Sequence, residues 1–114
     1  MITIPGVAPD MIANNIKPAY PTHPGEVLKD EIVYRGISQK QFAAQIGIQY
    51  TVLNEILNCK RPVNARFALL VEAALGIDAE LWINMQTRYN MLSAKRDKSF
   101  ADRLAKIRKA VAML

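Results

Sequence analysis

Hydrogen-bonding side chains gather in a short stretch near the middle of the chain. They are Gln49, Tyr50, Thr51 and Asn54. Gln and Asn can pair bidentately with adenine, Thr can contact a thymine methyl or a phosphate, and Tyr offers a ring and a hydroxyl. Val52, Leu53 and Ile56 fall on the opposite side of the same predicted helix and must point inward. An ordinary solvated face is the alternative, although such a face more usually carries Lys and Glu.

Basic side chains occur in two groups. Residues 36–66 contain four of them against the single acidic Glu55, a local charge of +3: Lys40, Lys60, Arg61 and Arg66. Residues 1–94 as a whole carry eight basic and eight acidic side chains, so the net charge of +5 lies entirely in residues 95–109. Two basic patches favour a polyanion partner, most often nucleic acid, whereas a solubilising surface is the simpler alternative.

Catalytic and metal-binding chemistry has little support in this sequence. One cysteine, Cys59, and one histidine, His23, are too few for a four-ligand zinc site or an internal disulfide. No carboxylate pair or Gly-rich phosphate loop is recognisable. We therefore expect no enzyme, no cofactor and no metal. Cys59 is expected to be an unreactive turn residue, and His23 to help cap the first helix rather than to bind metal or sense pH.

Length and composition limit the protein class. The 114 residues suit one domain, and 51% hydrophobic with 22% charged residues is ordinary for a soluble protein. No apolar run approaches the ~20 residues of a membrane span, and Met1–Pro9 lacks the basic leader of a secretory signal. The single cysteine fits a reducing cytoplasm. A large multi-domain enzyme, a secreted disulfide scaffold and a transmembrane protein are excluded.

Proline placement and helical periodicity divide the chain into three parts. A proline-rich arm (1–22), extended and with a short turn near Asp10–Asn14, precedes a helical domain (23–94) and a basic amphipathic helix (95–114). Capping residues predict the helix boundaries. The signals are Pro24 and Gly36 for the first helix, the Ser38–Gln41 capping box and Gly47 for the second, Asn64 and Gly76 for the fourth, Asp78 for the fifth, and a Ser99–Asp102 capping box for the last.

Two short helices joined by a glycine-containing turn form the sequence pattern of a helix-turn-helix. Ala43 is small where the two helices must approach, and Ile48 and Ile56 would fill the space between them. With Gln39 and Gly47, this spacing resembles the phage-repressor (XRE) class of helix-turn-helix. No stretch alternates with the two-residue period of a strand, so we expect an all-α fold.

The flanking sequence extends the resemblance to residues 23–92. Its motifs are His23-Pro24-Gly25-Glu26, Ser38-Gln39, Asn54-Glu55-Ile56-Leu57-Asn58-Cys59-Lys60-Arg61, Ala73-Ala74-Leu75-Gly76, and Leu81-Trp82-Ile83-Asn84-Met85-Gln86 with Arg88-Tyr89-Asn90. This region resembles the antidote proteins of the HigA/VapI family, the DNA-binding antitoxins of type II toxin–antitoxin pairs. The resemblance implies a lambda-repressor-like domain in a compact bundle of five to six helices, with the amphipathic C-terminal helix added.

The resemblance also implies roles for individual residues. In that fold the third helix enters the major groove with its N-terminal residues at the base edges. Base reading is therefore expected of Gln49, Tyr50, Thr51 and Asn54. Phosphate contacts are expected of Gln39, Lys60, Arg61, Asn64 and Arg66; Asn64 would cap its helix, contact phosphate, or do both.

The chain departs from the family pattern at two positions. Gln49 stands where the family commonly has a Ser or Thr cap, so Thr51 is an alternative cap that would shift the start of the third helix. Cys59 stands where the family favours glycine in the turn. If the backbone there needs a positive φ, Asn58 is the residue expected to adopt it.

Two apolar stripes are candidates for contacts with partners. Trp82, Met85 and Tyr89 share a stripe of the fifth helix and suit either the core or a dimer interface. A second stripe, spaced by 4, 3, 4 and 3 residues, runs along the last helix: Phe100, Leu104, Ile107, Val111 and Leu114. It suits packing on its own domain, contact with a second copy or a toxin, or a membrane surface, the last being weak because the helix is short and lacks Trp.

The resemblance implies an antitoxin with two activities. It would neutralise a small basic RelE-like mRNA-cleaving toxin, and as a homodimer it would repress its own operon by binding a palindromic operator in double-stranded DNA. A stand-alone repressor without a toxin, and an interaction module that has lost DNA binding, are the alternatives.

Overall fold

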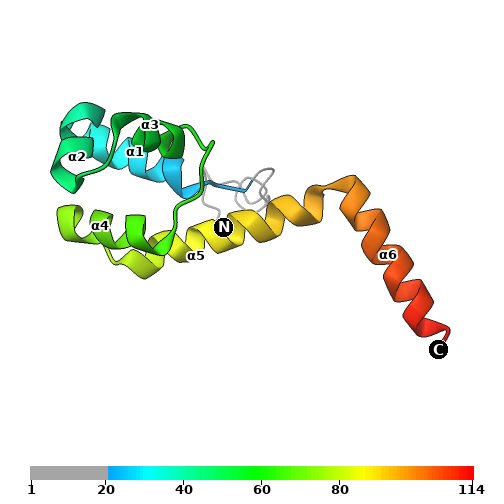
Figure 1. Cartoon of the computed structure of the whole chain (residues 1–114). Coiled ribbons are helices and arrows are strands. Elements are labelled where there is room, and N and C mark those ends of the chain that lie inside the picture. The colour runs from blue at the N-terminus through cyan, green and yellow to red at the C-terminus, as the bar shows by residue number, and fades with distance from the viewer. Residues whose placement is uncertain (1–20) are drawn as a thin grey trace, which may run out of the picture.

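The computed structural model describes residues 21–114, which form six helices and no strand (Figure 1). The helices are α1 (Pro24–Tyr34), α2 (Gln39–Ile46), α3 (Tyr50–Leu57), α4 (Ala65–Leu75), α5 (Ala79–Arg96) and α6 (Lys98–Ala112). The all-α fold is confirmed. The predicted arm, including the turn near Asp10–Asn14, lies outside the described residues except for its last two.

Most of the predicted caps are present. Ser38 and Gln41 form the capping box of α2, with the Ser38 hydroxyl accepting from the Gln41 amide at 3.1 Å and the Gln41 side chain accepting from the Ser38 amide at 2.9 Å. The side chains of Asn64 and Asp78 cap α4 and α5. Each cap satisfies an amide that the first turn of a helix leaves without a partner. The boundaries of these helices were therefore predictable from single residues.

His23 caps α1, as predicted. Its Nδ1 accepts a hydrogen bond from the Gly25 amide at 2.8 Å, and its ring meets the Tyr89 ring edge-on, with centroids 4.8 Å apart. Burial lowers the pKa of His23, an effect partly opposed by the charge of Glu26. The lowered pKa favours the neutral imidazole, which is the form that can accept this hydrogen bond.

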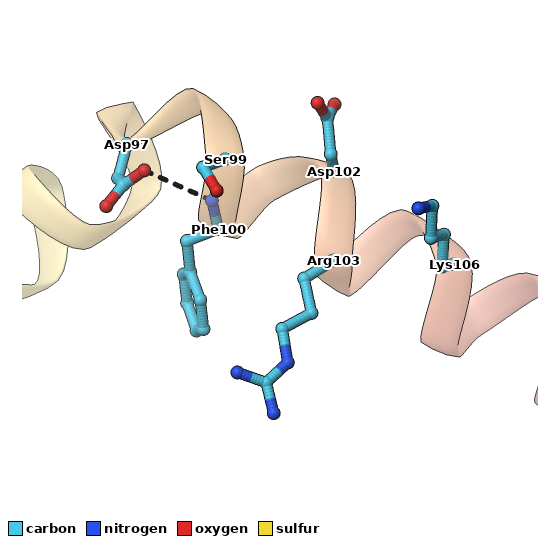
Figure 2. A pocket seen from close by; sticks show the side chains of 6 residues that line it. All are labelled: Asp97, Ser99, Phe100, Asp102, Arg103 and Lys106. Carbon is cyan, nitrogen blue, oxygen red and sulfur yellow. Dashed lines mark hydrogen bonds between the residues drawn. The ribbon is translucent and has the colours of Figure 1, made fainter.

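The start of α6 differs from the prediction. Asp97, rather than Ser99, is the N-cap, and its carboxylate accepts from the Phe100 amide at 3.1 Å (Figure 2). Asp97 also ends α5, so one residue both closes one helix and opens the next. Once the helix begins at Lys98, Ser99 lies within its first turn, and the predicted Ser99–Asp102 capping box does not form.

The core lies among the first five helices. It consists of Leu28, Ile32, Phe42, Ala43, Ile46, Leu53, Ile56, Leu57, Val63, Phe67, Ala68, Val71, Leu75 and Trp82. α4 packs against α5 and α2, while α1 packs against α3 and α5. Gln86 is a buried polar residue of α5, and its Oε1 accepts from the Val63 amide at 2.8 Å. This bond ties the segment between α3 and α4 to α5.

α6 turns away from the rest of the molecule at the far end of α5 (Figure 1). Its apolar stripe remains open to solvent, with Phe100, Ile107 and Val111 exposed by 40%, 51% and 60%. The stripe of α6 therefore does not pack against its own domain, which was one of the predicted roles. Contact with a partner stays a prediction for this stripe.

The turn after α3 adopts a left-handed conformation at Cys59, where φ is 65°. The Cys59 amide donates to the Ile56 carbonyl and the Lys60 amide to the Glu55 carbonyl, the two bonds of a Schellman motif. In that motif the residue after the C-cap takes the positive φ. The expectation that Asn58 would take it is wrong, because Asn58 is the C-cap itself, with φ at −99°.

The Cys59 thiol shows the features expected of an unreactive turn residue. Burial raises the pKa of the thiol, and the neighbouring charge of Glu26 raises it further. A thiol that stays protonated is a poor nucleophile.

We expect Cys59→Gly to stabilise the fold by about 0.5–1 kcal/mol relative to Cys59→Ala. Both variants remove the thiol, but alanine keeps the side chain that makes a positive φ costly. Urea unfolding of the two variants under identical conditions measures the difference. Equal midpoints would show that the left-handed turn stores no strain at this position.

Candidate nucleic-acid interface

α2 and α3 form the predicted helix-turn-helix. Ala43 is buried where the helices meet, Gly47 takes the left-handed conformation that ends α2, and Ile56 is buried on the inner face of α3. Ile48 packs against this core from the turn. These residues fix the angle between the two helices, as the spacing predicted.

A crowded backbone contact sets the position of α3 against α1. A side-chain carbon added at Gly25 would lie 1.9 Å from the Ile56 carbonyl oxygen, so only glycine fits there. Gly25 belongs to the first turn of α1, and Ile56 to the last turn of α3. Gly25 was part of the family motif, but which backbone it approaches could not be predicted from the sequence.

The N-terminal part of α3 presents its polar side chains to solvent. Gln49, Tyr50 and Thr51 are exposed, whereas Asn54 is half-buried. Gln49 is the N-cap but makes no side-chain capping bond, so its amide is not committed to the helix. The alternative cap, Thr51, is wrong because α3 begins one residue before it.

A side-chain hydrogen bond connects two of the predicted contact residues. The Asn54 Nδ2 donates to the Gln39 Oε1 at 3.0 Å, although the residues are 15 positions apart. Gln39 is the first residue of α2, and Asn54 lies in the second turn of α3. The bond joins the residue expected at phosphate to one expected at a base edge.

Asn58 also belongs to this polar network, and sequence reasoning gave it no site role. Its Nδ2 donates to the Asn54 carbonyl oxygen at 2.9 Å and to the Asn54 Oδ1 at 3.2 Å, and its own Oδ1 accepts from the Lys29 Nζ at 3.5 Å. The four-residue spacing of the two asparagines on a helix is the signal that could have revealed the contact.

The predicted phosphate-contact residues after α3 line two neighbouring hollows. Arg61, Asn64 and Arg66 line one of about 350 Å³ between α3 and α4. Lys60 lines the other, near His23 and Tyr89, and Arg61 borders this hollow as well. Asn64 uses its Oδ1 to cap α4 through the Phe67 amide, at 2.8 Å. Its predicted capping role is confirmed, and its Nδ2 donates no hydrogen bond in that cap.

Arg61 is held by an acidic neighbour. Its Nη2 and Nε lie 2.6 Å and 2.9 Å from the Glu55 Oε1, and both side chains are about half exposed. An exposed ion pair of this kind contributes little to stability. It can open at small cost when a stronger anion approaches.

The predicted interface stripe of α5 is only partly accessible. Trp82 is 2% exposed and belongs to the core, one of the two roles that the sequence allowed for this stripe. Met85 and Tyr89 are half-buried and still present some surface. Only these two of the three candidates offer side-chain area to a second protein.

Neither a metal centre nor a membrane span is found in the part of the chain that the structure describes. Within residues 21–114 no three His, Cys, Asp or Glu side chains gather as potential metal ligands. None of the helices in that range is long and apolar enough to cross a membrane.

Known proteins share both this sequence pattern and this fold. The helix-turn-helix family matches residues 29–82. Virulence-associated protein I of Dichelobacter nodosus is 36% identical over 77 residues, which are 67% of this chain and 71% of that protein. An addiction module antidote protein of the HigA family from Coxiella burnetii is 31% identical, with a TM-score of 0.68 over 76% of this chain and 94% of that one. The chain belongs to the HigA/VapI family.

This HigA/VapI-family chain is also similar to a family member solved with DNA. The antitoxin HigA of Pseudomonas aeruginosa, solved with the higBA promoter, is 29% identical, with a TM-score of 0.63 over 66% of this chain and 83% of that one. The family comprises helix-turn-helix antitoxins and regulators, and this protein is one of that class.

We expect Arg61→Ala and Glu55→Gln to shift DNA binding in opposite directions. Removing the guanidinium should weaken binding to all duplexes and reduce the salt slope by about one unit, because one phosphate contact is lost. Replacing the carboxylate should strengthen binding to all duplexes, because it frees Arg61 and removes a negative charge. Fluorescence anisotropy across a salt series measures both. A loss confined to one sequence would place Arg61 among the base readers.

Proposed function

We propose that this HigA/VapI-family protein is a sequence-specific DNA-binding antitoxin of a type II pair. It binds a palindromic operator as a homodimer to repress its own operon, and it neutralises a RelE-like mRNA-cleaving toxin. The observation that carries the DNA-binding part is the exposed polar face at the start of α3, joined to the N-terminus of α2 by the Asn54–Gln39 hydrogen bond.

The contacts on DNA follow from this geometry. α3 lies in the major groove with Gln49, Tyr50, Thr51 and Asn54 at the base edges. Gln39 meets phosphate at the start of α2, where free amides and the positive end of the helix dipole favour an anion. On the other side of α3, Lys60, Arg61, Asn64 and Arg66 meet the backbone. Phosphate contacts set the register, while the α3 side chains supply sequence preference.

Dimerisation supplies the second half of the operator contact. Two copies related by a two-fold axis place their α3 helices in half-sites about 34 Å apart. Met85 and Tyr89 of α5 and the exposed stripe of α6 are the candidate surfaces for this contact or for the toxin. The P. aeruginosa HigA solved with its promoter supports the DNA-binding part, and the C. burnetii antidote protein supports the antitoxin part.

We expect Asn54→Ala to lose about 1–3 kcal/mol of discrimination between the preferred duplex and one substituted at a single A·T pair. The fold should survive, because Asn54 is not a core residue. Selection from a random duplex library defines the preferred sequence, and competition binding measures the ratio. Lys40→Ala, on the exposed side of α2, serves as a control that should weaken binding without changing preference. An unchanged preference in Asn54→Ala would remove Asn54 from the reading set.

We expect the small reading frame next to this gene to arrest growth when expressed alone and to be harmless when co-expressed with this protein. Asn54→Ala should still restore growth, because toxin capture does not require base reading. Growth curves in a host that lacks both genes measure the outcome. If the neighbouring gene product is harmless when expressed alone, the antitoxin activity is contradicted. The protein is then a stand-alone repressor, provided that selection from the duplex library yields a preferred sequence.

A further inference from the structure

The polar network around Asn54 has a defined direction. The Lys29 ammonium can only donate, so it must face the Asn58 Oδ1. The Asn54 carbonyl can only accept, so it must face the Asn58 Nδ2. These two contacts determine which end of the Asn58 amide is the oxygen and which is the nitrogen. The orientation of the next side-chain amide in the network follows from it.

The orientation of Asn58 determines that of Asn54. Because the Asn58 Nδ2 also donates to the Asn54 Oδ1, the oxygen of Asn54 must lie on that side. The Asn54 Nδ2 then lies on the opposite side and donates to the Gln39 Oε1. Gln39 is left with its Nε2 donors for phosphate.

The hydrogen-bonding capacity that remains on Asn54 suits one base. An asparagine amide has two N–H donors and two acceptor lone pairs, and the network uses one of each. One donor and one acceptor remain, which is what bidentate pairing with the N7 and N6 of adenine requires. Reversing the amide would exchange the positions of donor and acceptor and break this match.

We propose that Asn58 is a specificity-determining positioning residue. It holds the Asn54 amide in the one orientation that pairs with adenine, without contacting the base itself. This inference rests on the proposed function, because it concerns how the same α3 face reads DNA. It adds to that function a residue outside the reading set and a base identity at the position that Asn54 contacts.

The test measures discrimination one base pair at a time. The preferred duplex from library selection is compared with duplexes substituted at each position, using the wild type, Asn58→Ala, Asn58→Asp and Asn54→Ala. Asn58→Asp keeps the size of the side chain but has no donor for the Asn54 Oδ1. Its added negative charge weakens binding to every duplex alike and so cancels in each ratio. Asn84→Ala removes an exposed amide from α5 as the matched control, and thermal unfolding checks that each variant is folded.

We expect the preference for adenine at one position to fall about fivefold or more in both Asn58 variants, with other positions unchanged within about twofold. In an Asn54→Ala background, Asn58→Ala should cause no further loss, because Asn58 acts through Asn54. A helix-capping role alone would lower the affinity for all duplexes and leave every ratio intact.

Three outcomes would overturn the inference. In the first, Asn54→Ala abolishes the base preference at one position, but both Asn58 variants keep the preference at every position. This result overturns the positioning role of Asn58 and leaves the proposed DNA-binding function standing. Additive losses in the double variant show that Asn58 does not act through Asn54. Selection of no preferred sequence overturns the proposed DNA-binding function, and this inference with it.

Discussion

The approach of the Gly25 backbone to the Ile56 carbonyl is the contact on which the site depends. It brings the first turn of α1 against the last turn of α3, with no room for a side chain between them. The Ile56 carbonyl also accepts the Cys59 amide, so the left-handed turn starts from the same oxygen. One turn further along α1, Lys29 then comes within reach of Asn58. A single close backbone contact thus positions α3, the turn that follows it and the far end of the polar network.

The distribution of charge separates the molecule into two regions with different electrostatic properties. The helical domain is nearly neutral, and its basic side chains near α3 include one, Arg61, that is already paired with Glu55. Most of the excess positive charge lies on α6, which points away from α3 (Figure 1). At the start of α6, Phe100 and Arg103 extend to one side, and Asp102 and Lys106 to the other (Figure 2). Most of the excess positive charge therefore lies away from α3, the helix proposed to contact DNA.

Sequence reasoning succeeded where one residue determines one local structure. The caps at His23, Ser38 and Asn64 and the glycine stop at Gly47 could be predicted because each satisfies or ends a helix through its own backbone or side chain. It failed where two candidates competed over a few residues. Asp97 displaced Ser99 as the cap of α6, and Cys59 rather than Asn58 took the positive φ, because the motif requires that conformation one residue after the cap.

The contacts around Asn54 were beyond prediction for a different reason. Sequence spacing could place Asn54 and Asn58 on one helix face, but it could not show that Gln39, 15 residues earlier, would accept from the same amide. That contact depends on the angle between α2 and α3, which the packing of Ala43 and Ile56 sets. Both hydrogen-bonding groups of Asn54 are thereby engaged before any ligand arrives. A base-contacting side chain that is already oriented loses less side-chain entropy on binding. The packing that stabilises the fold therefore also favours selective contact with a base.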